Sequence, residues 1–185
     1  MARDADRTRS RLVAAARQHF ARNGYDGATV RAIAAEAEVN PALISRYFGG
    51  KEQLFAEAVS IDLAFPDLSG TSPDAIGEAL VRHFFRRWEG DPVDDLLRVL
   101  IRTAATNEEA AARARAVFEG QVAVMVERVS GRADARRRAV LIATQILGLA
   151  YCRYVLGLAD DALPQDVAVR TIGATLQRYL SGELE

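Results

Sequence analysis

Apolar residues recur at steps of three and four along most of the chain, and this spacing constrains the fold more than any other feature. Leu12, Ala16 and Phe20, for example, follow one another at four-residue intervals. Side chains spaced in this way lie on one face of an α-helix, because the helix completes a turn in roughly 3.6 residues. We find no run of period-two alternation bounded by turn residues, which a half-buried strand would show. The chain is therefore predicted to be all-α.

Prolines and glycines predict where the helices begin and end. A side-chain acceptor placed directly before a proline, which is typical of an N-cap, occurs at Asn40-Pro41, Ser72-Pro73 and Asp91-Pro92. Pro164 is expected to open the last helix, whereas Pro66 is expected to end one, because the residue before a proline avoids the α conformation. The pattern predicts about nine helices. They lie near residues 6–23, 29–37, 40–47, 51–64, 73–89, 91–105, 107–130, 133–158 and 164–181.

The charged residues divide the chain into a basic first quarter and an acidic remainder. Residues 1–51 contain 9 Arg or Lys against 5 Asp or Glu, whereas residues 52–185 contain 15 against 20, and the net charge is −1. This division suggests separate roles for the two parts, with a polyanion as the partner of the first. The segment from Phe65 to Ser72, rich in Gly, Pro, Ser and Asp, is expected to join two units.

Composition also excludes several classes of protein. Half of the 185 residues are apolar, which is typical of a chain that folds. Cys152, the single cysteine, cannot form an internal disulfide or a multi-cysteine zinc site, and it fits a reducing compartment. No export signal is found, and the longest run without a charge has 14 residues, whereas a membrane span needs about 20. We expect a cytoplasmic protein with no membrane partner.

The sequence contains no recognisable catalytic or cofactor-binding motif. His19 and His83 lie far apart, and neither has the paired spacing of a metal site. GGKE at residues 49–52 lacks the glycine and the Ser or Thr that a phosphate-binding loop requires. We therefore expect no catalytic residues, no metal and no cofactor, and we predict that the chain is not an enzyme.

Two of the expected helices, within TVRAIAAEAEVNPALISRYFGGKEQL from Thr29 onward, are too short to be stable alone. Their predicted inner faces consist of Val30, Ile33, Ala34 and Ala37 in the first helix, and of Ile44 and Phe48 in the second. Both must pack against the preceding helix through Leu12, Ala16 and Phe20. This arrangement is a helix-turn-helix, whose second helix can enter the major groove of DNA.

Three motifs occur together between Thr8 and Val59. They are a first helix that ends in an aromatic residue followed by GY-G-T, a T-x-x-x-I-A helix, and the run VNPALISRYFGGKEQL. As a set they make this stretch similar to the DNA-binding domain of the tetracycline-repressor (TetR) family of bacterial transcriptional regulators. The resemblance implies a helix-turn-helix DNA-binding domain at residues 1–50 and an effector-binding and dimerisation domain at residues 51–185. The second part shares less with the family, chiefly its helical pattern and the YCRYVLGL segment.

The resemblance also implies a set of residues that contact DNA. Those that face the major groove are Pro41, Ala42, Leu43, Ser45 and Arg46, with Arg31 from the preceding helix. Those that hold phosphates are Thr29, Tyr47 and Lys51, the only lysine in the chain. Arginine can donate two hydrogen bonds to a guanine edge, so most base reading should fall on Arg31 and Arg46. Two alternatives remain open, that Arg46 contacts phosphate only and that Tyr47 only covers the local core.

Two positions depart from the family pattern. Ser45 replaces the usual tyrosine, so a short hydroxyl stands where an aromatic contact to DNA is expected. Glu38 stands where the turn usually has glycine, and a left-handed conformation at a residue other than glycine costs roughly 1 kcal/mol. Either the turn is strained or its shape differs slightly from that of the family. The operator sequence therefore cannot be transferred from relatives.

The acidic part contains two apolar stripes that predict a homodimer built from four helices. They consist of Val140, Ala143, Leu147, Ala150 and Tyr154, and of Val169, Ile172, Leu176 and Tyr179. Gly148, Gly157 and Gly173 would permit close approach of such helices. The alternative is that both stripes face the chain's own core.

Family resemblance further implies a small-molecule pocket in this part. Candidate lining residues are His83, Phe84, Trp88, Phe118, Gln121, Met125, Tyr151 and Cys152, a mostly apolar set with a few polar groups. For each of them alone, ordinary core packing is the competing interpretation.

Together these features predict a ligand-responsive regulator that represses transcription. It would bind a palindromic double-stranded operator as a dimer, and a small, largely apolar effector would release it. The alternative is a helical module that binds a small molecule or a protein partner without reading DNA sequence.

Overall fold

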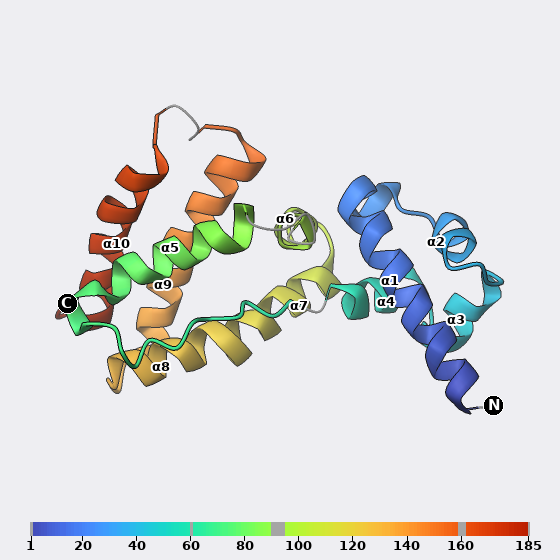
Figure 1. The fold of residues 1–185 in the computed structure, drawn as a ribbon, viewed down its shortest axis with the longest axis horizontal. Coiled ribbons are helices and arrows are strands. Elements are labelled where there is room, and N and C mark those ends of the chain that lie inside the picture. The colour runs from blue at the N-terminus through green and yellow to red at the C-terminus, as the bar shows by residue number, and fades with distance from the viewer. Residues whose placement is uncertain (1, 60, 90–94, 159–161, 185) are drawn as a thin grey trace. The chain divides into compact units, whose positions relative to one another are not determined.

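The computed structural model describes residues 2–59, 61–89, 95–158 and 162–184, which are helical with short connections and contain no strand (Figure 1). The prediction of an all-α chain is confirmed. Contacts divide the chain into two compact units. Unit 1 consists of residues 1–61 and 91–114, and unit 2 of residues 62–90 and 115–185. This division by contacts differs from the expected functional boundary at residue 50, which remains a prediction.

Unit 1 is built around one long helix. Its helices are α1 (Ala2–Gly27), α2 (Val30–Glu36), α3 (Ala42–Phe48), α4 (Lys51–Ala58), α6 (Asp95–Thr103) and the first part of α7 (Glu108–Val117). Leu12, Ala16 and Phe20 of α1 are completely buried, as the four-residue spacing predicts. Phe20 meets the Phe55 ring of α4 edge to face, with 4.9 Å between the ring centroids. α1 therefore supplies the surface that the short helices need to be stable.

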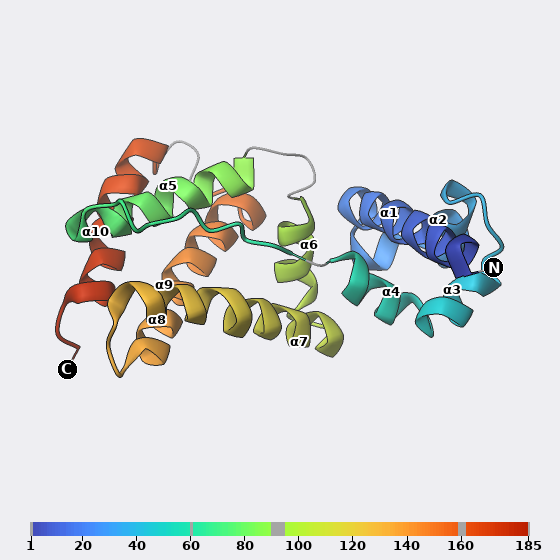
Figure 2. The same ribbon diagram turned by 60° about the horizontal axis from the view of Figure 1, so that its bottom comes forward.

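Unit 2 is also built from helices. It contains a short 3₁₀ turn (Pro73–Ala75), α5 (Ile76–Glu89), a π-helical segment (Phe118–Ala123), α8 (Val124–Ser130), α9 (Ala135–Ala150), a second π-helical segment (Tyr151–Val155) and α10 (Gln165–Ser181). Residues 61–72, called the connector below, form the extended teal trace that precedes α5 in Figure 2. None of the described helices is long and apolar enough to cross a membrane.

The expected helix over residues 51–64 is wrong at its end. α4 ends at Ala58, and Val59 leaves the helical conformation with φ −88° and ψ 43°. Arg17 donates from Nε to the Ala58 carbonyl at 2.9 Å, and Arg113 donates to the Val59 carbonyl at 3.3 Å. These arginines satisfy carbonyls that a helix end leaves without partners, so the apolar residues that follow need not continue the helix.

Other predicted boundaries fare differently. Pro66 does not end a helix, because it lies inside the extended connector. The proposed start at Asp91-Pro92 lies outside the described residues. The helix expected over residues 133–158 changes to π geometry after Ala150 and ends at Val155. Asn40 caps α3 as predicted, since its Oδ1 accepts a hydrogen bond from the Ala42 amide at 2.8 Å.

α5 and α10 cross at two glycines (Figure 1). A Cβ added at Gly77 would lie 2.2 Å from the Gly173 carbonyl oxygen, and one at Gly173 would lie 2.9 Å from the Glu78 Cα. The Gly77 amide donates to Gln177 Oε1 at 2.9 Å, and Gln177 Nε2 donates to the Pro73 carbonyl at 2.9 Å. Gly173 therefore permits the close approach of α10 to α5 within the chain.

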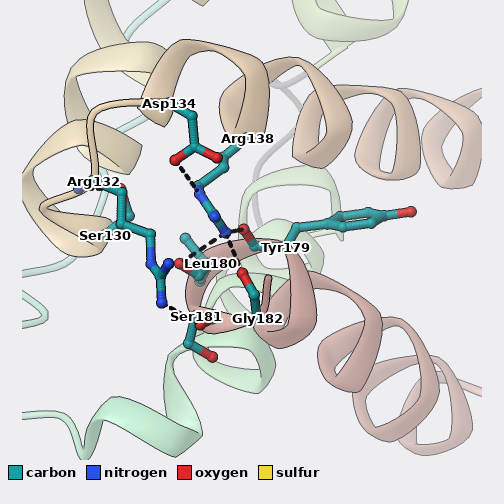
Figure 3. A network of polar contacts seen from close by, with 8 residues as sticks. All are labelled: Ser130, Arg132, Asp134, Arg138, Tyr179, Leu180, Ser181 and Gly182. Atoms are coloured by element: carbon teal, nitrogen blue, oxygen red, sulfur yellow. Dashed lines mark hydrogen bonds and ion pairs between the residues drawn. The ribbon is translucent and has the colours of Figure 1, made fainter. Parts of the chain in front are cut away.

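Arg138 joins α9 to the end of α10, and its side chain is only 2% exposed (Figure 3). Its guanidinium donates to Asp134 Oδ1 at 2.7 Å, to the Tyr179 carbonyl at 2.6 Å and to the Gly182 carbonyl at 2.9 Å. A buried arginine thus neutralises its charge with one carboxylate and caps the last turn of a second helix. Arg138 stands in a run of three arginines, and the sequence alone does not distinguish the buried one from its neighbours.

Candidate nucleic-acid interface

The first helix of the candidate interface begins at Thr29. Thr29 Oγ1 accepts a hydrogen bond from the Ala32 amide at 3.1 Å, which makes it the N-cap of α2. Ile33 and Ala34 are completely buried, whereas Arg31 is exposed on the other face of the helix. The hydroxyl proton of Thr29 is not used by this cap, so the side chain can still donate to a phosphate oxygen.

The turn between α2 and α3 keeps a left-handed residue, so the first of the two interpretations, a strained turn, applies. Glu38 adopts a φ of 52°, in the left-handed region that favours glycine. The Glu38 carboxylate accepts a hydrogen bond from Arg11 of α1 at 3.0 Å. This ion pair ties the turn to α1, although both groups are exposed and the pair contributes little to stability.

One face of α3 packs against the rest of unit 1, and the other face is exposed to solvent. Ile44 is completely buried and Phe48 is 8% exposed, so these two residues fix the helix against α1 and α4. The residues predicted to face the groove lie on the opposite side. Pro41, Ala42, Ser45 and Arg46 are exposed, and Leu43 and Tyr47 are half-buried. The structure therefore brings the predicted base-reading residues of α3 onto one accessible surface.

Lys51 opens α4 directly after Gly49 and Gly50, both of which have positive φ. Its Nζ lies 4.4 Å from the centroid of the Tyr25 ring, within the range of a cation–π interaction. Tyr25 thus orients the lysine at the helix N-terminus, where the macrodipole also favours an anion. Tyr25 belongs to the GY-G-T motif, but the motif alone does not predict this contact with Lys51.

Two arginines near the N-terminus, Arg9 and Arg11, lie on α1 and form ion pairs. Arg9 forms an ion pair with Glu57 of α4, and its guanidinium lies 5.1 Å from the centroid of the Phe48 ring. Arg11 binds Glu38 as described above. Arg9 therefore contacts α3 and α4, whereas Arg11 contacts the turn that precedes α3.

The structure places the eight predicted pocket residues in different surroundings. His83, Phe84 and Trp88 are buried in the core of unit 2, where the Trp88 ring stacks on Tyr154 with 5.0 Å between centroids. Phe118 is half-buried, and Tyr151 and Cys152 are exposed. Gln121 and Met125 do line a cavity of about 630 Å³, together with connector residues and other residues of α8. Ordinary packing therefore explains His83, Phe84 and Trp88, because their apolar surface is already covered.

The predicted dimer stripes divide in a similar way. Val140 and Leu147 of α9 are 47% and 50% exposed, which is unusual for large apolar side chains, and Ala143 is half-buried beside them. Ala150, Val169 and Leu176 lie in the chain's own core, so the competing interpretation accounts for these three. Ile172 and Tyr179 are half-buried. Tyr154 also packs within the chain. Burial, and the hydrogen bond that its hydroxyl donates to the Glu89 carboxylate, raise the pKa of its phenol.

Two family descriptions match this sequence. "Bacterial regulatory proteins, tetR family" matches residues 12–58, and "Tetracyclin repressor-like, C-terminal domain" matches residues 74–180. The HTH-type transcriptional repressor SCO4008 of Streptomyces coelicolor is 46% identical over 66 residues, which are 34% of this chain and 34% of that protein. The repressor NicS of Pseudomonas putida is 41% identical over 54 residues, 29% of this chain and 26% of its own. The matched region thus spans about a third or less of either curated relative.

Solved structures resemble nearly the whole chain. A TetR-family regulator of Streptomyces coelicolor has 28% identity and a TM-score of 0.55, with 95% of each chain covered. A transcriptional regulator of Rhodococcus sp. has 21% identity and a TM-score of 0.69, with 96% of this chain and 99% of that chain covered. NalD of Pseudomonas aeruginosa, the secondary repressor of a multidrug efflux pump, has 18% identity and a TM-score of 0.64, with 98% and 100% covered. The last two identities are low enough that these likenesses establish the fold alone.

A helix-turn-helix with an exposed second helix, joined to a larger helical unit, defines a class of bacterial regulatory proteins. Within that class, the chain belongs to the TetR family, since the two matched regions together cover most of its length. It is accordingly a regulatory protein and not an enzyme.

Proposed function

We propose that this protein is a dimeric repressor that reads operator DNA with α3 and releases it when a small molecule binds unit 2. The observation that carries the proposal is the arrangement of α3. Its two buried residues, Ile44 and Phe48, fix the helix to unit 1, while the side chains expected at base edges remain accessible. A rigid helix with an exposed face of this kind can enter a major groove, whose base edges carry a distinct pattern of donors and acceptors.

Within this interface we assign different roles to the two kinds of contact. Arg46, exposed in the last turn of α3, and Arg31, exposed on α2, would donate to base edges. Thr29, Tyr47 and Lys51 would bind phosphates, and Pro41, Ala42, Leu43 and Ser45 would contact the groove without a bidentate hydrogen bond. Phosphate contacts fix the register of the protein on the duplex, whereas base contacts determine the preferred sequence.

The proposed dimer places α9 of one chain against α9 of another. Val140 and Leu147 expose large apolar side chains on this helix, and Tyr151, 46% exposed, follows on the π-helical segment. Burial of such side chains against a second copy removes apolar surface from water. This stabilises the dimer by about 25 cal/mol per Å² of apolar surface buried. The residues from α10 contribute less than the sequence predicts, because Val169 and Leu176 are already buried. The expected location in the cytoplasm stays part of this proposal.

The roles of Arg46 and Lys51 can be separated by DNA binding. Arg46→Ala should lose about 1 to 3 kcal/mol of binding to the operator and little on random duplex, because it removes a base contact. Lys51→Ala should weaken both duplexes alike and reduce the slope of log K against log salt by about one, because it removes a phosphate contact. Binding is measured by fluorescence anisotropy over a salt series.

Arg178→Ala is the control for lost charge, since Arg178 is exposed on α10 in unit 2. It should bind both duplexes as the unaltered protein does. Equal losses on operator and random duplex for Arg46→Ala would contradict base reading and support the phosphate-only alternative.

A further inference from the structure

The connector is held to unit 2 by three side chains at the point where it enters that unit. His83 Nε2 donates to the Leu63 carbonyl at 2.8 Å, and Arg87 donates to the Asp62 carbonyl at 2.7 Å, both from α5. Gln121 Oε1, on the π-helical segment, accepts a hydrogen bond from the Leu63 amide at 2.7 Å. Leu63 thus has both of its backbone polar groups bound to side chains rather than to a regular helix. We call these three contacts the connector clamp.

The clamp is formed with an uncharged histidine. His83 is 6% exposed, and burial lowers the pKa of its imidazole, with Arg86 and Arg87 acting in the same direction. The neutral ring must carry its proton on Nε2 to donate to a carbonyl. The hydrogen bond to Leu63 therefore persists near neutral pH without a charged group inside the core.

A cavity of about 630 Å³ lies directly beside the clamp. One wall is the connector from Asp62 to Ser69, and the other is the helical stretch that carries Gln121, Met125 and Val129. Its volume lies within the range of small-molecule sites, and most of its lining side chains are apolar. Gln121 belongs to both features, since it lines the cavity and binds the Leu63 amide.

We infer that this cavity is the effector site, that it takes an apolar organic amine, and that Gln121 couples its occupancy to the connector. The inference rests on the proposed function, because it names the ligand class and the coupling residue of the proposed regulator. An amine N–H would compete with the Leu63 amide for Gln121 Oε1. Loss of that hydrogen bond loosens the connector close to the C-terminus of α4, from which it is separated by only a few residues.

The charges around the cavity favour an amine over an acid. Two carboxylates, Asp62 and Asp67, line it against one guanidinium, that of Arg128. The Ser69 amide and the nearby Arg128 charge lower the pKa of Asp67, so this carboxylate is ionised near neutral pH. An anionic ligand would face like charges, which costs affinity, whereas an N–H donor meets an excess of acceptors.

Two fluorescent probes with the same ring system test the ligand class. N-phenylnaphthylamine offers an N–H and carries no charge, and anilinonaphthalene sulfonate adds one negative charge to it. The amine should bind the full chain at one site per chain. The sulfonate should bind at least about tenfold more weakly. Met125→Trp, which fills the cavity, should abolish amine binding, whereas Glu127→Trp on the exposed face of α8 should leave it unchanged. No amine binding, or equal binding by Met125→Trp, would overturn the site.

Hydrogen exchange of the Leu63 amide tests the coupling. N-phenylnaphthylamine should raise its exchange rate about tenfold in the unaltered chain, since a hydrogen bond is lost. Gln121→Met should raise the rate without the probe, and Gln121→Glu, which keeps the acceptor, should restore protection. An exchange rate that the bound probe leaves unchanged would overturn the role of Gln121.

A final measurement separates this inference from the proposed function. The amine should lower operator affinity about fivefold or more in the unaltered chain and have no effect on Met125→Trp. Absence of sequence-specific DNA binding would contradict the proposed function while the probe and exchange measurements still decide the site. Normal operator binding that does not respond to bound amine would overturn the inference alone.

Discussion

Replacing Arg138 by methionine should lower the free energy of unfolding by about 2 to 5 kcal/mol, because buried carbonyls lose their hydrogen-bond donor. Methionine fills much of the same buried volume but donates no hydrogen bonds. It therefore leaves the Tyr179 and Gly182 carbonyls at the end of α10 without their buried donor. Chemical denaturation followed by circular dichroism measures the loss. Arg178→Met, at an exposed position of α10 in the same unit, is the control for a lost guanidinium and should change stability by less than about 0.5 kcal/mol.

The same network gives the sign of an acid effect. The hydrogen bond and charge of Arg138 lower the pKa of Asp134 below its ordinary value. A carboxyl group whose pKa is lower in the folded state contributes stability above its unfolded pKa, and this contribution is lost as the pH falls through the folded value. As the pH falls, the free energy of unfolding of Arg138→Met should therefore decrease less than that of the unaltered chain. If Arg138→Met lowers the free energy of unfolding by less than about 1 kcal/mol at neutral pH, the capping role assigned to Arg138 is contradicted.

Gly77→Ala should be the second strongly destabilising change, with a loss of about 3 kcal/mol or more. The added methyl group would lie 2.2 Å from the Gly173 carbonyl oxygen and 2.7 Å from the Gln177 amide nitrogen, and both of these atoms are backbone. No side-chain rotation can relieve such an overlap, so α5 and α10 must move apart. Thermal unfolding should show a lower Tm, and the apolar residues between the two helices should become more accessible to solvent.

Gly120→Ala is the control for a methyl group added to a helical glycine. Nothing lies within 4 Å of the Cβ position at Gly120, so the substitution should be neutral or stabilise by up to about 1 kcal/mol. An unchanged Tm for Gly77→Ala would show that α5 and α10 do not cross closely in solution.

The fold class and the surface of α3 could be predicted from the sequence because both depend on local patterns. The spacing of Ile44 and Phe48 predicts the buried face of α3, and Asn40-Pro41 predicts its start. The left-handed turn at Glu38 also follows from a local rule. The end of α4 could not be predicted, because its carbonyls are capped by Arg17 and Arg113, which are distant in sequence.

The contacts within unit 2 could not be predicted either, because they also join residues that are distant in sequence. An apolar stripe on a helix does not state whether the chain's own core or a second chain covers it, and the structure answers this differently for Leu176 and Leu147. The clamp on Leu63 joins residues 58 positions apart, so no local pattern predicts that Gln121 binds it. Gln121 and Met125 could be named as pocket residues, but their cavity includes connector residues that sequence periodicity does not predict.

The central claim, that α3 reads a specific operator, is tested most directly by selection of bound duplexes from a random double-stranded library with the full chain. The selected sequences should converge on an inverted repeat whose half-site centres are about 34 to 36 Å apart, or a multiple of that distance, as two recognition helices of a dimer require. A selected pool that stays as diverse as the starting library, although the protein binds DNA, would contradict the claim.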